Sequence, residues 1–549
     1  MQDASISDLL AEPMLGDGGT YPDLLRHMTT FDPDLLAIEW SGGKISYGQL
    51  LSMVAAEAEY LTGLGIGPGD VVASMVTSHP YSLANHLAVV LIGALSAPVY
   101  IESEGAVLAK TLNVFQAKAV VAMPAAIPKL EAIMGDVPTL EHIVSMLDSD
   151  FDRMMQEGRD IGPWLESAHP DPTDPCLLLS TSGTTGTPKA VIFAHSTGNS
   201  GYLMARKWGI PVPAKVYITT SWGHGAVSWQ VAIAYWFGGS VVLPDRFTAS
   251  GFWDDVRRYD CTIALLFGPM IRAVFNKMDE AGTEIPAGTD FHLISAGCPP
   301  DLWKRLTDAG VKIFEVYSSS EAWNAADACM IISNPDGRYQ TGSAGRPWSE
   351  HEARIVDDEG NVVDEGQIGE LHMKPVGKSG VVKYYNNTTA AEGLVVDGWV
   401  KTGDYFYQKD GDYFFVARKR DIIRRRGINM SPGSIEDELQ KHPAFETVVA
   451  LATPSALGEE EIKVVVVPVA GATVEPREVA QFASENLPRH MRPRYVEVVA
   501  SIPSTQGNGR PQRVQLERKW RTASTWDTEE ERYLQPEAVS TGAPRHDGD

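Results

Sequence analysis

Short apolar runs alternate with longer, partly polar stretches through the first 320 residues of the chain. Apolar runs this short, bounded by polar or turn-forming residues, are typical of buried strands, and they occupy residues 71–76, 119–122, 177–179, 240–243 and 263–267. Stretches with helical spacing lie at 50–64, 84–95 and 226–237. The alternation predicts an α/β architecture with largely parallel sheets.

The longest apolar run covers residues 87–100 and contains Pro98. Its length of about 14 residues falls short of the roughly 20 that span a bilayer. We therefore predict a buried helix that leads into a strand, and no membrane span.

The pattern changes from about residue 342 to short strands and tight turns, such as those at 357–360 and 409–412. This texture predicts a β-rich subdomain. After the basic run 417–426, a helix is expected to begin at 434–439 and a strand at 463–467. We predict an N-terminal domain over residues 1–419, a compact C-terminal domain over 420–524, and a polar, disordered tail over 525–549.

Composition narrows the functional classes. A chain of 549 residues is too long for one core, and its formal net charge is −25. Such a charge disfavours binding to nucleic acid or to an anionic membrane surface. The four cysteines show no metal-ligand or disulfide spacing, and the N-terminus lacks a basic segment followed by an apolar one. These features predict a cytoplasmic protein.

The segment Thr181-Ser182-Gly183-Thr184-Thr185-Gly186-Thr187-Pro188-Lys189 directly follows a predicted strand. Glycines let backbone N–H groups approach a ligand, hydroxyls donate to anionic oxygens, and lysine adds a positive charge. The segment therefore predicts a polyphosphate-binding loop, although the Walker A spacing does not fit it. A flexible surface loop is the alternative that its composition allows.

Further motifs follow in order. Tyr317-Ser318-Ser319-Ser320-Glu321 comes after a predicted strand, Trp399-Val400-Lys401-Thr402-Gly403-Asp404 precedes a hairpin, and Arg418-Lys419-Arg420-Asp421 follows it. With the flanking segments 342–347 and 369–371, these blocks resemble the adenylate-forming superfamily of acyl- and aryl-CoA ligases, nonribosomal adenylation domains and luciferases. The resemblance covers about residues 21–517. It implies a large N-terminal domain of two mostly parallel sheets with helices plus the β-rich subdomain, and a small mobile α+β C-terminal domain.

The resemblance also implies roles for individual residues. The loop residues Thr181, Ser182, Gly183, Thr184, Thr185 and Gly186, with Lys189, would hold the ATP phosphates. Tyr317 would stack on adenine opposite Ala296, Gly297 and Cys298, while Ser320 would touch the α-phosphate and Glu321 would bind Mg²⁺. Taken alone, Tyr317 is also typical of a half-buried strand end, and Glu321 of an exposed helix start.

Asp404 and Arg418 match residues that bind the ribose in the family, and Arg420 matches the hinge about which the C-terminal domain turns. Arg424 is a further nucleotide-binding candidate in the same basic run. Asp404 also suits an ordinary Gly-Asp turn, and the basic run also suits a solvated surface.

The implied chemistry is attack of a carboxylate on the ATP α-phosphorus to give acyl-AMP and pyrophosphate, followed by transfer to a thiol or amine. The family places a lysine in the C-terminal block for the first step, where this chain has Arg510. Arginine keeps the charge but has a different geometry. We expect retained activity; a degenerate member that binds nucleotide without turnover is the alternative that Arg510 leaves open.

The segment 221–229 matches the block that lines the acid pocket in the family. By position the acid-binding candidates are Trp222, His224, Trp229, Phe267, Met270, Cys298 and Trp323, of which His224 would contact or gate the acid. A packed histidine is the alternative for His224. Aromatic residues outnumber polar ones, which favours an apolar or aromatic acid, and Gly225 or Ala226 stands where amino-acid-activating relatives carry an aspartate.

The loop 423–430 most resembles that of the carnitine/crotonobetaine-type and fatty acyl-CoA ligases. This favours CoA as the acceptor. The alternative is a stand-alone adenylating enzyme that transfers the acyl group to an amine or to a carrier-protein thiol.

Overall fold

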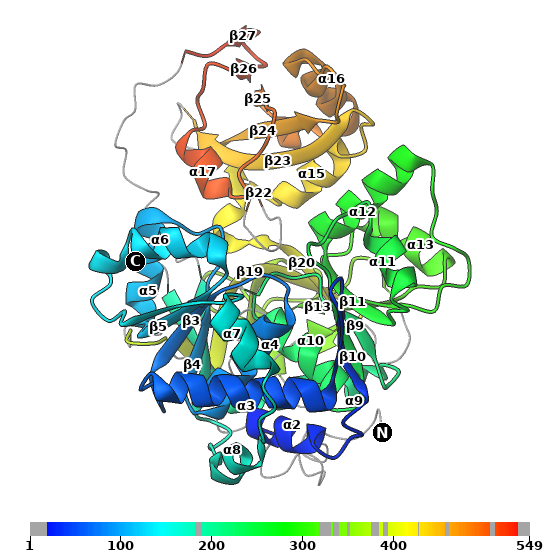
Figure 1. Cartoon of the computed structure of the whole chain (residues 1–549). Coiled ribbons are helices and arrows are strands. Elements are labelled where there is room, and N and C mark those ends of the chain that lie inside the picture. The colour runs from blue at the N-terminus through cyan, green and yellow to red at the C-terminus, as the bar shows by residue number, and fades with distance from the viewer. Residues whose placement is uncertain are drawn as a thin grey trace.

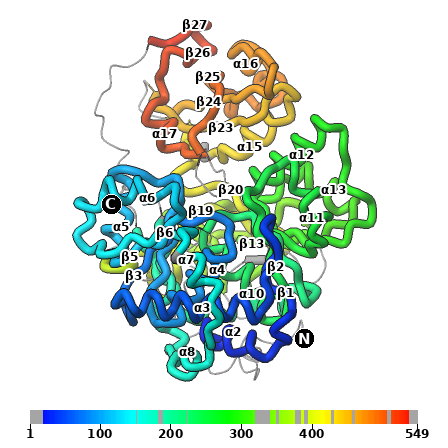
Figure 2. Tube along the Cα trace, viewed as in Figure 1, coloured from blue at the N-terminus to red at the C-terminus, as the bar shows by residue number. Residues whose placement is uncertain are grey.

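The computed structural model describes residues 19–181, 189–222, 224–317, 331–332, 340–347, 352–374, 384–387, 393–425, 428–455, 460–504 and 511–535. A large N-terminal body contains most of the chain, and a smaller C-terminal body sits above it (Figure 1). The tube view shows the N-terminal half of the chain wound through the lower body and the described residues from about 430 to 535 in the upper one (Figure 2).

The first sheet has six strands in the order β6-β5-β3-β4-β7-β8. All neighbours are parallel except β7 and β8, which are antiparallel. The strands are β3 (Val71–Met75), β4 (Leu95–Pro98), β5 (Ala119–Ala122), β6 (His142–Ser145), β7 (Pro175–Thr181) and β8 (Lys189–Ala194). The predicted phosphate loop therefore connects two antiparallel strands at the edge of this sheet.

The second sheet has nine strands in the order β15-β14-β13-β12-β11-β9-β10-β1-β2. Its central strands are parallel, and only the strands at its two edges are antiparallel. The strands are β1 (Leu36–Trp40), β2 (Gly43–Ser46), β9 (Lys215–Tyr217), β10 (Ser240–Leu243), β11 (Ile263–Phe267), β12 (His292–Ala296), β13 (Lys312–Tyr317), β14 (Ile331–Ile332) and β15 (Arg346–Pro347). Because parallel strands end at the same side of a sheet, the residues after β11, β12 and β13 are brought together.

Helices cover these sheets (Figure 1). They are α2 (Tyr21–Met28), α3 (Tyr47–Gly63), α4 (Pro80–Leu91), α5 (Gly105–Phe115), α6 (Ile127–Glu131), α7 (Ser149–Gln156), α8 (Gly162–Ser167), α9 (Ser200–Trp208), α10 (Ala226–Tyr235), α11 (Phe252–Arg258), α12 (Gly268–Ala281) and α13 (Pro300–Asp308). Two helices begin earlier than their apolar pattern predicted. A capping box at Ser46 starts α3, and Pro80 occupies the first turn of α4. None of the helices in the described ranges is long and apolar enough to cross a membrane.

The β-rich subdomain contains a five-stranded antiparallel sheet, as the turn pattern predicted. Its strands are β16 (Glu352–Val356), β17 (Gly369–Lys374), β18 (Val395–Val396), β19 (Trp399–Lys409) and β20 (Asp412–Arg418). Asp410 and Gly411 form the β19–β20 turn with φ of 51° and 83°. Aspartate and glycine are common in tight hairpin turns that need such positive φ values. The hairpin register sets Asp404 opposite Arg418.

In its described residues, the C-terminal body combines a two-stranded ribbon, a five-stranded sheet in the order β23-β24-β25-β26-β27, and three α-helices. Its elements are β21 (Ile423–Arg425), β22 (Ile428–Met430), α15 (Pro432–Leu439), β23 (Phe445–Pro454), β24 (Glu460–Pro468), α16 (Pro476–Asn486), β25 (Tyr495–Val498), α17 (Arg513–Arg518), β26 (Thr525–Asp527) and β27 (Arg532–Tyr533). A short 3₁₀ turn, Lys419–Asp421, connects it to β20. We propose the domain boundary at this turn.

The prediction of a disordered tail from residue 525 is wrong for residues 525–535. β26 pairs with β25, and Thr525 and Asp527 are buried. Their polar side chains have partners: the Thr525 hydroxyl accepts a hydrogen bond from Lys463, and Asp527 pairs with Arg494 at 3.3 Å. Composition alone did not reveal these partners. The rest of the predicted tail, 536–549, lies outside the described residues.

Candidate active site

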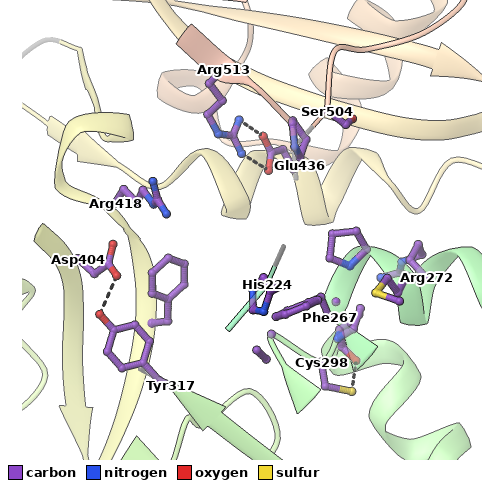
Figure 3. A pocket seen from close by; sticks show the side chains of 18 of the residues that line it. His224, Phe267, Arg272, Cys298, Tyr317, Asp404, Arg418, Glu436, Ser504 and Arg513 are labelled. Carbon is purple, nitrogen blue, oxygen red and sulfur yellow. Dashed lines mark hydrogen bonds and ion pairs between the residues drawn. The ribbon is translucent and has the colours of Figure 1, made fainter. Parts of the chain in front are cut away.

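A cleft of about 2110 Å³ lies between the two bodies. The ends of β11, β12 and β13 and the start of α12 form one wall, and the β19–β20 hairpin forms another (Figure 3). The face of α15 and the segments around Ser504 and Arg513 close it from the C-terminal side. Residues far apart in sequence thus meet at one place.

Tyr317 and Asp404 face each other in this cleft although 87 residues separate them. The Tyr317 hydroxyl donates to Asp404 Oδ2 at 2.7 Å (Figure 3). Burial, followed by the charge of Asp404, raises the pKa of Tyr317 well above its usual value, so the phenol stays protonated. Arg418 lies opposite Asp404 on β20 and also lines the cleft. An aromatic face, a carboxylate and a guanidinium from three separate motifs therefore lie together, and their nucleotide-binding roles stay predictions.

The turn Ala296-Gly297-Cys298 follows β12, the parallel neighbour of the strand β13 that ends at Tyr317, and it also lines the cleft. Gly297 has φ +85°, a left-handed conformation that suits glycine. The N–H groups of Gly297 and Cys298 both donate to the carboxylate of Glu315, a residue of β13. Glu315 lines the cleft and was not predicted from the sequence. A charged residue inside the otherwise apolar run 313–316 was the available signal.

His224 lies in the cleft beside Phe267, with ring centroids 5.2 Å apart. Its Nδ1 accepts the N–H of Ala226 at 3.1 Å, and burial lowers its pKa to about 4. It is therefore a neutral, packed ring. Trp229 and Met270 also line the cleft. Trp222 does not belong to the described residues that line it; instead it is buried in the N-terminal core.

Lys189 begins β8 and lines the cleft, with its ammonium 5.2 Å from the centroid of the Tyr384 ring. Thr181 is the last residue of β7 and pairs with Lys189 in the ladder. Several predicted site residues lie outside the described residues, so their roles stay predictions. These are Ser182, Gly183, Thr184, Thr185, Gly186, Ser320, Glu321, Trp323 and Arg510.

The predicted hinge residue Arg420 lies in the 3₁₀ turn between the bodies, 3.4 Å from Asp421. The preceding Lys419 pairs with Asp358 at 3.0 Å and with Glu370 at 3.1 Å, both from the β-rich subdomain. Arg424 also reaches Asp358, at 3.6 Å, from the C-terminal side. Asp358 is thus shared by cations on the two sides of the predicted hinge.

The C-terminal wall of the cleft is polar. Arg513 makes a bidentate contact with Glu436 of α15, at 2.7 and 3.0 Å (Figure 3). Asp437, next along α15, also lines the cleft, and burial followed by the charge of Glu436 raises its pKa to about 6. On the facing wall, Arg272 of α12 makes a bidentate pair with Asp301.

Comparison with known proteins identifies the family. The pattern of the AMP-binding enzyme family matches residues 25–385, and that of the AMP-binding enzyme C-terminal domain matches 434–508. A sulfoacetate–CoA ligase of Cupriavidus necator is 28% identical over 87% of this chain and 92% of its own length. A crotonobetaine/carnitine–CoA ligase of Salmonella choleraesuis is 28% identical over 84% of this chain and 90% of its own.

The fold is also similar to that of solved structures. An anthranilate CoA ligase in complex with anthranoyl-AMP superposes with a TM-score of 0.79 at 22% identity, covering 90% of this chain and 96% of its own. The structural similarity extends over both bodies, which have the expected arrangement of a large N-terminal and a small C-terminal domain. The first family pattern covers more than half of the chain, and the second continues into the C-terminal body. The chain belongs to the AMP-binding enzyme family, the adenylate-forming superfamily that its motifs resemble.

Proposed function

We propose that this protein activates an apolar or aromatic carboxylic acid with ATP and transfers the acyl group to CoA. The enzyme class follows from the family and its curated relatives: it is an AMP-forming acid–thiol ligase. The proposed substrates are supported by one observation: Tyr317, Asp404 and Arg418 line the same cleft as an apolar pocket.

In this proposal adenine lies between the Tyr317 ring and the Ala296–Cys298 turn, and Asp404 and Arg418 bind the ribose. Stacking on an aromatic face and hydrogen bonding to a carboxylate suit a purine nucleoside. Lys189 and the loop before it hold the phosphates. Mg²⁺ accompanies the phosphates, with Glu321 as its protein carboxylate; this ion would neutralise charge on the phosphate oxygens.

The acid occupies the part of the cleft near His224, Phe267, Trp229 and Met270. The His224 ring is neutral above its lowered pKa of about 4, so it offers no cation to pair with a second charged group on the acid. Its neighbours there are mostly apolar. These properties support a substrate whose only charge is the reacting carboxylate, in keeping with an apolar or aromatic acid.

The chemistry has two steps. A carboxylate oxygen of the acid attacks the ATP α-phosphorus, and the bond from that phosphorus to pyrophosphate breaks. The CoA sulfur then attacks the acyl carbon, the bond to AMP breaks, and the thiol proton leaves to solvent. Positioning and electrostatic stabilisation account for most of the catalysis in this type of phosphoryl chemistry. Turning of the C-terminal body about Arg420 between the steps is part of the proposal.

The experiment is pyrophosphate exchange with a panel of acids, followed by product identification by mass spectrometry. We expect exchange with an apolar or aryl acid and an acyl-CoA when CoA is added. An amide or an acylated carrier protein, formed in place of acyl-CoA when amines or a carrier protein are supplied, would establish the alternative acceptor. ATP binding without exchange for any acid would support the degenerate member instead.

A further inference from the structure

The Glu315 carboxylate is buried against the turn Ala296-Gly297-Cys298. Its side chain accepts the N–H groups of both Gly297 and Cys298, the latter at 3.2 Å. Glu315 is only 5% exposed, so few water molecules compete for these bonds. Hydrogen bonds from backbone N–H groups to a buried carboxylate are charge-assisted and stronger than neutral ones. Two successive peptide groups of the turn are therefore fixed by one side chain.

The same turn is held from its other side by the start of α12. A Cβ atom on Gly268 would lie 2.1 Å from the carbonyl oxygen of Gly297, so only a glycine permits this approach. Glu315 sits two residues before Tyr317 on β13, and Ala296 ends the neighbouring parallel strand β12. Glu315 thus connects the turn after β12 with the strand that carries Tyr317, the two features between which adenine is proposed to lie.

We propose that Glu315 is a positioning residue for the nucleotide: by binding the Gly297 and Cys298 N–H groups it sets the turn at the distance from Tyr317 that adenine requires. The inference rests on the proposed function, because that function places adenine between this turn and the Tyr317 ring. Glu315 acts through the turn and has no role in the chemical steps.

The position of Glu315 also makes ATP binding sensitive to pH. Burial raises its pKa to about 7, against the opposing effects of the Gly297 N–H, the Ser295 hydroxyl and the Cys298 N–H. The ionised form, which predominates above pH 7, is the stronger acceptor. Among the described side chains around it, the Cys298 thiol and the Tyr317 phenol stay protonated, and Arg272 is paired with Asp301 beyond Cys298. ATP affinity should therefore fall as the pH drops below about 7.

The test is the equilibrium binding of ATP with Mg²⁺, without any acid, to the full chain from about pH 5.5 to 8.5. We expect Glu315→Gln to bind ATP about tenfold more weakly than the wild type at pH 8, since a neutral amide oxygen accepts the Gly297 and Cys298 N–H groups more weakly than the ionised carboxylate does. The ratio of wild-type to variant affinity should fall towards one at the acid end, whereas the titration of ATP and of Asp437, whose pKa is about 6, affects both proteins alike. A merely structural role would give a ratio that does not change with pH.

Glu57→Gln is the matched control. Glu57 is also a buried carboxylate, held by Asn85 at 2.6 Å in the core of the N-terminal body and away from the cleft. This variant should keep the wild-type affinity and its pH dependence. Equal ATP affinity of Glu315→Gln and wild type at pH 8, or equal weakening in both variants, would overturn the inference. A wild type that fails to bind ATP at all would overturn the proposed function as well.

Discussion

The Tyr317 side chain offers a ring and a hydroxyl whose contributions to nucleotide binding can be measured separately. The ring lies 4.7 Å from Phe406, edge to face, and the hydroxyl binds Asp404 at 2.7 Å. Tyr317→Phe removes the hydroxyl and keeps the aromatic face. Tyr317→Ala removes both.

The magnitudes follow from these contacts. Base stacking on an aromatic side chain contributes about 1–3 kcal/mol, so Tyr317→Ala should weaken ATP binding roughly 5- to 150-fold. The hydroxyl already bonds Asp404 without nucleotide, so its loss removes a contact within the protein and not one to ATP. Tyr317→Phe should therefore change ATP affinity by less than about threefold, while lowering the free energy of unfolding by about 1–2 kcal/mol.

The assay is calorimetric titration with ATP and Mg²⁺, with unfolding in urea measured for each variant. Tyr407→Ala is the control, because Tyr407 stacks on Phe414 in the β19–β20 hairpin and does not line the cleft. It should lose stability and keep its ATP affinity. The stacking argument is refuted if Tyr317→Ala binds ATP within threefold of wild type, or if Tyr317→Phe weakens binding as much as Tyr317→Ala does.

Three further predictions concern other parts of the chain. Burial lowers the pKa of His224 to about 4, so its ring is neutral above about pH 5.5. The pH profile of pyrophosphate exchange between pH 5.5 and 9 should therefore have the same shape in His224→Asn as in the wild type. Loss of the rising or falling part of the profile in the variant would show that His224 titrates during turnover. Arg510→Ala should slow pyrophosphate exchange about 100-fold, whereas Arg510→Lys should stay within about threefold; a large gain with lysine would mean that the arginine is a defect. Lys463 is buried against Glu497, so Lys463→Met should lower the free energy of unfolding by about 3–5 kcal/mol and leave the ATP affinity unchanged. Adding Glu497→Gln should recover most of the lost stability. Equal stability of the single and double variants would contradict the pairing.

Much of the fold was predictable because its core strands are continuous apolar runs. The segments 119–122, 240–243 and 263–267 coincide with β5, β10 and β11. The run 87–100 contains the end of α4 and then β4, as its length and Pro98 indicated. Boundaries set by side-chain capping, such as Ser46 before α3, were less accessible from apolar periodicity alone.

Candidate site residues could be proposed from the sequence where they belong to a local motif. Contacts between residues that are distant in the sequence could not. Tyr317 and Asp404 belong to separate motifs, and the fold brings them together. Glu315 was missed because its role depends on backbone N–H groups 17 and 18 residues earlier. Likewise, no sequence pattern links Lys419 to Asp358, 61 residues before it. Trp222 matched the acid-pocket block in sequence, but its side chain packs into the core.

The measurement that tests the central claim most directly is pyrophosphate exchange by the wild-type protein with a panel of carboxylic acids, continued with CoA. We predict ATP-dependent exchange with at least one apolar or aromatic acid, and formation of AMP and the matching acyl-CoA in equal amounts. Tight ATP binding without exchange for any acid in the panel would contradict the claim that this cleft activates carboxylates.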